Sequence, residues 1–199
     1  MIIQLLLISA FQLLTGPNIR IPIDAPNRKL IEFIKLTEIG QFGLKRKDRK
    51  EVPEHLHTGI DIQRPNKNYS NAAIYAIDAG TVISKREDGP FAQVIIEHDF
   101  GNLVFWTVYE HIAEIQVDLF QEVDSETKIA RFFNLDELNQ YGWQFDHFHF
   151  EVLKRRPIRI QPKSETPERL YNSFTLNCFV LKELNDNFYS PLDFLESHF

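Results

Sequence analysis

The sequence predicts a mainly β domain built on an antiparallel sheet with few short helices. Several short stretches rich in Val, Ile and aromatic residues follow one another, with turn residues between them. The chain has 199 residues, enough for one domain with a proper core, and 43% of them are apolar, including 17 Phe. A formal net charge of -6 argues against attraction to nucleic acid or to anionic membranes.

Residues 1–16 are interpreted as a signal peptide. They contain a mostly apolar run at 2–14, which is too short to span a bilayer, since a span needs about 20 residues. Two features count against a signal: no Lys or Arg precedes the run, and Thr15-Gly16-Pro17 is not a clean cleavage site. The alternative is an ordered N-terminal helix or strand packed on the core.

Residues 17–39 are expected to form an extended connector and a first strand. Three prolines lie within 17–27, and the pattern at 30–37 fits a strand or a short helix. A turn at 40–43 then leads to a basic stretch at 45–50. We interpret that stretch as a solvated loop, because acidic residues interrupt and follow it.

Four strands are expected next: two around an Asp-Ala-Gly turn within 73–83, a third at 93–98 and a fourth at 103–111. Residues 87–90 and 99–102 predict hairpin connections. The fourth strand should carry Tyr109 and His111 on a common face.

The pattern weakens between 112 and 146, where Ile115 and Val117 are expected to continue a strand and 134–141 to hold a helical turn. Residues 154–187 are first charged and then apolar, without a recognisable motif, and the tail from Tyr189 closes the domain. The single Cys178 lies in an apolar context, so we expect it to be buried.

Residues 145–152 alternate apolar and polar side chains with period two, which predicts a strand with His147 and His149 on one face. Neighbours on one face lie roughly 6.6 to 7 Å apart at the Cα. One ring could therefore bind a metal while the other reaches a water on it. A pair of histidines in this spacing is a weak motif alone, and a surface strand is the plain alternative.

His57 and Asp61 are separated by four positions and would lie about 13 Å apart on a straight strand, too far to share a metal. A bend at Gly59 would bring both side chains inward, and Thr-Gly-Ile between them is poor helix material. We therefore place His57 at a loop end and Asp61 at a strand start. Together with His149 they supply two imidazoles and a carboxylate, a set that suits a catalytic metal.

These motifs resemble those of the lysostaphin-type (LytM-domain) zinc metalloendopeptidases, which cut peptide crosslinks in bacterial cell walls. The family's HxxxD motif matches 57–61, its HxH motif matches 147–149 with Phe-Glu-Val following, and its tyrosine-x-histidine strand end matches 109–111. The similarity covers most of 40–149 and the terminal Ser-Pro-Leu at 190–192.

The resemblance implies the lysostaphin-type (duplicated hybrid motif) fold, with zinc (Zn2+) held by His57, Asp61 and His149. It implies that His111 and His147 are catalytic, as acid/base and oxyanion stabiliser in a metal-assisted hydrolysis of peptidoglycan stem peptides or crosslinks. It further implies a peptidase domain at 40–199 and export to the periplasm, cell envelope or medium. The remaining histidines are expected to be structural or exposed: His55, His98 and His198.

Two departures from the family pattern bear on specificity. Residues 138–146 replace a glycine-rich turn before HxH, so the groove wall should be built differently. An insertion at about 154–187 fits a lid, a partner surface or an inert embellishment. Two other functions stay open: a non-catalytic module of the same fold that activates cell-wall amidases, and a metallopeptidase with a non-wall peptide substrate.

Overall fold

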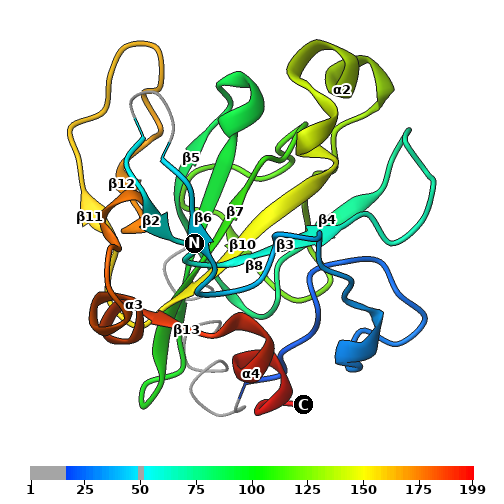
Figure 1. Ribbon diagram of the computed structural model, residues 1–199. Coiled ribbons are helices and arrows are strands. Elements are labelled where there is room, and N and C mark those ends of the chain that lie inside the picture. The colour runs from blue at the N-terminus through cyan, green and yellow to red at the C-terminus, as the bar shows by residue number, and fades with distance from the viewer. Residues whose placement is uncertain (1–16, 49–51) are drawn as a thin grey trace.

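The computed structural model describes residues 17–48 and 52–199, so the expected signal peptide lies outside the described residues. A seven-stranded sheet forms the centre of the described part (Figure 1). Its strands are β3 (Ile60–Gln63), β5 (Gly80–Arg86), β6 (Gln93–Asp99), β7 (Val104–Glu110), β8 (Glu122–Val123), β10 (His147–Leu153) and β13 (Phe188–Tyr189). They follow the order β13-β10-β7-β6-β5-β8, with β3 also paired to β10, and all pairs are antiparallel. The predicted fold class is confirmed.

Smaller strand pairs and short helices surround this sheet. The pairs are β1 (Lys45–Arg46) with β2 (His55–Leu56), β4 (Ala73–Tyr75) with β9 (Lys128–Arg131), and β11 (Ile158–Arg159) with β12 (Tyr171–Asn172). The helices are η1 (Ile31–Phe33), η2 (Gly89–Phe91), α2 (Leu135–Tyr141), η3 (Trp143–Phe145), η4 (Thr175–Asn177), α3 (Leu181–Asn187) and α4 (Pro191–Glu196). Across 17–48 and 52–199, no helix has the length and apolar character that crossing a bilayer requires.

The N-terminal connector packs on the core of the sheet. Ile19, Ile21 and Ile23 are fully buried in the main hydrophobic cluster, beside core residues of β3, β7 and β10. The strand or short helix expected at 30–37 is the 3-10 helix η1, after which Leu36 forms an isolated bridge to Ile62 of β3. The connector therefore contributes to the same core that supports β3.

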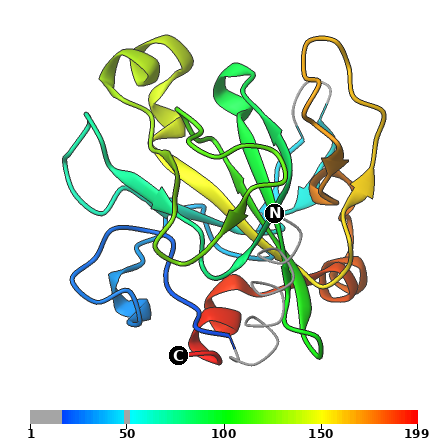
Figure 2. The ribbon, with the colours of Figure 1, turned by 180° about the vertical axis from the view of Figure 1, so that it is seen from behind.

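The insertion at 154–187 lies beside the sheet and is tied to a second hydrophobic cluster. Cys178 is buried there as expected, together with Leu184 of α3 and with Trp106 and Leu153 of the sheet. In both views the insertion and β4 lie on opposite sides of the sheet (Figures 1 and 2). The insertion is thus a packed part of the structure.

Three expectations about the strands were wrong in detail. The strand expected to start at residue 145 begins at His147, because residues 143–145 form the 3-10 helix η3. Tyr109 and His111 do not share a face: Tyr109 packs on Phe150 in the core, whereas His111 has a φ of 63°, which ends β7 and turns its ring away from that face. Ile115 and Val117 lie outside the strands, and the short strands β8 and β9 were not predicted.

Candidate metal centre

The register between β3 and β10 brings Asp61 and His149 together. The two residues are direct partners across this antiparallel pair. Directly opposed side chains on one face have Cβ atoms about 4.5–5.5 Å apart, so their polar ends can meet. His149 Nδ1 lies 3.0 Å from Asp61 Oδ1.

His57 reaches the same point from the bend that precedes β3. Its Nε2 lies 3.1 Å from Asp61 Oδ1 and 2.9 Å from His149 Nδ1. The bend at Gly59 is present as expected, and the glycine also permits a close approach to β10. A Cβ there would lie 2.8 Å from His149 Cε1 and closer still to the carbonyl oxygen of Phe150. A glycine is therefore required at this position.

The outward-facing atoms of all three side chains are held by partners of their own. His57 Nδ1 donates to the carbonyl oxygen of Gln41 (2.9 Å), Asp61 Oδ2 accepts from Arg46 (2.6 Å), and Glu151 Oε1 accepts from His149 Nε2 (3.1 Å). The atoms left to bind a metal are the three that converge: His57 Nε2, Asp61 Oδ1 and His149 Nδ1. Two oriented imidazoles and a carboxylate, each with an outer partner, are the ligand set and surroundings that a divalent metal such as zinc requires.

Arg46 was placed in a solvated basic loop from the sequence, and that interpretation was wrong. Its side chain is only 16% exposed because it pairs with Asp61, whereas that of the adjacent Lys45 is 66% exposed and pairs with Glu54. The two residues alternate across β1, so one faces the site and the other faces solvent.

Electrostatics keep the carboxylate of this cluster ionised. Burial alone would raise the pKa of Asp61, but hydrogen bonds and charges from His149 and His57 hold it well below its ordinary value. Burial lowers the pKa of His57. Burial also acts to lower the pKa of His149, yet its hydrogen bonds to Asp61 and Glu151 raise it to about 10. A metal ion and a proton therefore compete for His149.

His111 and His147 lie beside this cluster, and within 17–48 and 52–199 no hydrogen bond engages His111 Nε2 or either ring nitrogen of His147. Their rings meet edge to face with centroids 5.5 Å apart, and His147 Nε2 lies 3.7 Å from Asp61 Oδ1. His111 Nδ1 donates to the carbonyl oxygen of Pro90 (2.6 Å), which leaves its Nε2 available. Burial lowers the pKa of both rings, to about 4 for His147, so both are neutral at pH 7. The structure thus brings all five predicted site residues into one region.

The other histidines lie elsewhere. His55 Nδ1 donates to the carbonyl oxygen of Pro53, His98 is buried between Ala79 and Thr107, and His198 contacts the carbonyl oxygen of Phe194. They have structural surroundings, as expected.

An aromatic wall stands next to His111, and one of its two residues, Phe145, comes from the segment at 138–146 that departs from the family pattern. Phe145 of η3 packs on the His111 ring with centroids 4.9 Å apart, and Phe91 of η2 packs on both. Phe91 is 47% exposed.

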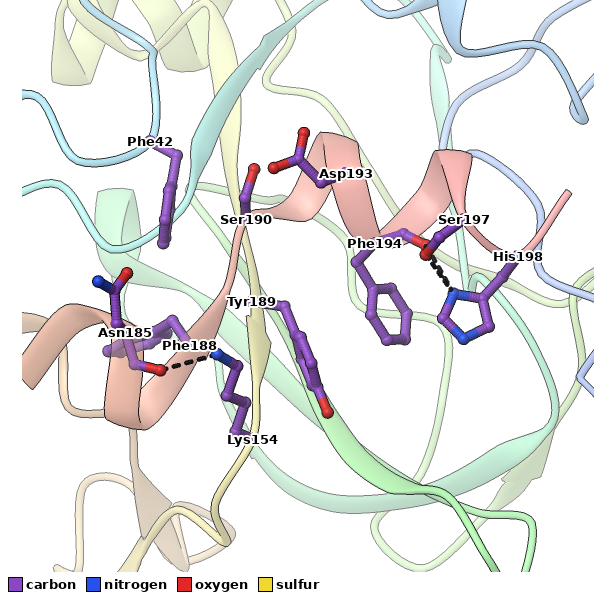
Figure 3. Close-up of a pocket in the computed structure, with 10 residues that line it drawn as sticks. All are labelled: Phe42, Lys154, Asn185, Phe188, Tyr189, Ser190, Asp193, Phe194, Ser197 and His198. Atoms are coloured by element: carbon purple, nitrogen blue, oxygen red, sulfur yellow. Dashed lines mark hydrogen bonds between the residues drawn. The ribbon is translucent and has the colours of Figure 1, made fainter.

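A hollow at the C-terminal end of the chain is separate from the metal centre. It is lined by Phe42, by Lys154 and by residues between Asn185 and His198, and none of the five site residues is among its lining residues (Figure 3). The rings of Tyr189 and Phe194 pack on each other with centroids 5.0 Å apart, and the carboxylate of Asp193 extends away from both rings (Figure 3).

The antiparallel sheet thus positions a His-Asp-His cluster that could hold a metal ion. The family model described as peptidase family M23 matches residues 55–162, more than half of the chain. The chain therefore belongs to peptidase family M23, which confirms the resemblance seen in its motifs.

Solved structures similar to the chain share low identity with it. A zinc-containing peptidase from Vibrio cholerae is 28% identical over 70% of this chain and 37% of its own, with a TM-score of 0.47. Lysostaphin is 16% identical over 84% and 52%, with a TM-score of 0.49. A chain of the SpoIIIAH–SpoIIQ complex is 20% identical over 78% and 96%, with a TM-score of 0.45. No curated protein sequence matches the chain.

Proposed function

We propose that this protein is a zinc-dependent endopeptidase that hydrolyses peptide crosslinks of bacterial peptidoglycan. One observation supports this proposal above the others. In a chain of a peptidase family, His57 Nε2, Asp61 Oδ1 and His149 Nδ1 converge within about 3 Å of one another, beside two further imidazoles with free nitrogens.

The three converging atoms would hold the ion, and His111 and His147 would handle protons. A bound zinc ion supplies Lewis-acid chemistry that activates water for attack on a peptide carbonyl. A neutral imidazole can accept a proton from water and return it to the leaving amine. The other imidazole can stabilise the oxyanion by a hydrogen bond. His111 is oriented for this work because its Nδ1 is tied to Pro90 and its Nε2 is not.

The wall substrate, the domain limits and the location are further parts of this proposal. We assign the peptidase domain to 40–199 with the insertion at 154–187, and the protein to the periplasm, envelope or medium, where peptidoglycan is found. The motif resemblance supports these assignments. The aromatic wall beside His111 is the feature expected to govern which peptide bond is cut.

Digestion of purified peptidoglycan, followed by mass analysis of the muropeptides, tests the proposal. The zinc-loaded chain should release products with new peptide ends, and a chelator should abolish them. His111→Ala and His147→Ala should lose cleavage and keep zinc, while His198→Ala, remote from the site, should behave like the wild type.

The alternatives predict other results. A chain that binds one zinc ion yet cleaves neither peptidoglycan nor peptides would be a non-catalytic module. Cleavage of unrelated peptides with intact peptidoglycan would indicate a different substrate. Either result would defeat the proposed function.

A further inference from the structure

We propose that Glu151 is a positioning residue for the metal ligand His149, and that Ser173 and Thr175 of the insertion hold Glu151 in place. This inference rests on the proposed metal centre. It assigns a role to the insertion, for which the sequence left a lid, a partner surface and an inert embellishment open.

Glu151 lies on the same face of β10 as His149, two residues further along the strand. Its side chain is 0% exposed, and its Oε1 accepts from His149 Nε2 at 3.1 Å. With Nε2 engaged in this way, the other ring nitrogen of His149 faces Asp61 and His57. The Glu151 contact therefore decides both which nitrogen is free and where it points.

A fully buried carboxylate needs several partners of its own, because burial of an unpaired charge is strongly unfavourable. Three hydroxyl groups donate to Glu151. Thr58 (2.5 Å) and Thr175 (2.8 Å) donate to Oε1, and Ser173 donates to Oε2. Two of these three donors belong to the insertion, and they also contact each other at 3.1 Å. Because hydroxyl donors carry no charge, the Glu151 carboxylate keeps its negative charge and still accepts from His149 Nε2.

The segment that carries these hydroxyls is fixed on both sides, to β5 of the sheet before it and to β2 after it. Before it, the backbone N–H groups of Leu170 and Tyr171 donate to Ser84 of β5 at 3.0 and 3.1 Å. After it, the buried Cys178 accepts from the N–H of Leu56 at 2.8 Å. Positioning demands such a supported second layer, since a loosely held partner would leave the ligand free to turn.

The test compares zinc affinity in variants that remove or keep the hydroxyls. Zinc would be titrated into the full chain in competition with a chromophoric chelator. Loss of an outer partner typically costs 10- to 100-fold in metal affinity, so Ser173→Ala/Thr175→Val should weaken zinc binding by about that factor. Thr175→Val alone should show a smaller loss, and Ser173→Thr/Thr175→Ser, which keep both hydroxyls, should bind like the wild type.

Two further measurements separate positioning from general support. Ser164→Ala/Thr166→Val, in the same insertion but away from Glu151, should leave zinc affinity unchanged. Cobalt(II) in place of zinc should give an altered visible spectrum only in the variants that lose hydroxyls at 173 and 175, because that spectrum reports ligand orientation.

The outcomes distinguish this inference from the proposed function. Unchanged zinc affinity and cobalt spectrum in a folded Ser173→Ala/Thr175→Val chain, or in folded Thr175→Val if the double variant does not fold, would overturn the role of the insertion alone. A wild-type chain that binds no zinc would overturn the metal centre, and this inference with it.

Discussion

Replacement of Arg46 by Met is expected to weaken zinc binding without unfolding the chain. The substitution keeps an aliphatic stem of similar length and removes the donor to Asp61 Oδ2, now at 2.6 Å. Removing one partner of a buried ion pair can cost about 3–5 kcal/mol. Here Asp61 keeps His57 and His149 as partners, so the loss should be that of one charged hydrogen bond, about 1.5–3 kcal/mol.

Two assays measure the consequence of this change. The free energy of unfolding of the metal-free chain in urea should fall by about 1.5–3 kcal/mol. Zinc affinity should fall 10- to 100-fold, because the ligand Asp61 then lacks the outer partner that holds its Oδ2. Lys45→Met is the matched control: Lys45 is the neighbouring cation on β1, its ion pair with Glu54 is exposed, and removal of such a pair changes stability by at most about 1 kcal/mol. Equal zinc affinity in the two variants would refute the role assigned to Arg46.

Three further outcomes follow from the same geometry. His111→Ala or His147→Ala should lower the rate of crosslink cleavage by about 10²- to 10⁴-fold with full zinc content; loss of zinc in either would show that the roles are wrongly assigned. Gly59→Ala should destabilise the fold by about 3 kcal/mol, measured by urea unfolding, because the new methyl group meets the backbone of Phe150; an unchanged midpoint would contradict this. Burial lowers the pKa of His98 from 6.5 to about 4. The contribution of neutral His98 to the free energy of unfolding is therefore complete above pH 6.5, and up to about 3 kcal/mol of it is lost as the pH falls towards 4. His98→Gln should flatten the dependence of the unfolding free energy on pH between 6.5 and 4, and an unaltered slope would count against this.

Features set by short-range pattern were predictable. The β-branched run at 93–98 and the run at 103–111 predicted two hairpin strands, and β6 and β7 occupy nearly the same residues. The period of two in β10 also predicted that His147 and His149 share a face. The same period places Glu151 on the face of His147 and His149, opposite Phe150 and Val152, so its burial could not be anticipated from those two neighbours.

Features set by contacts between distant segments were not predictable. The direction of Arg46 depends on its pairing with β2, and the position of Ser173 depends on an insertion anchored at Ser84 and Leu56. The turn at His111 depends on a positive φ, which the neighbouring residues in the sequence do not predict. Motif order located the metal centre because its ligands lie on β3, on β10 and in the bend before β3. The residues that support these ligands come from remote parts of the chain.

The central claim is that this chain has one catalytic zinc site. Its most direct test is to add zinc stepwise to the metal-free chain and to measure cleavage of peptidoglycan crosslinks at each step. If His57, Asp61 and His149 form one catalytic zinc site, cleavage should be absent from the metal-free chain, rise in proportion to added zinc and level off at one ion per chain. Full cleavage before zinc is added, or none once one ion is bound, would contradict it.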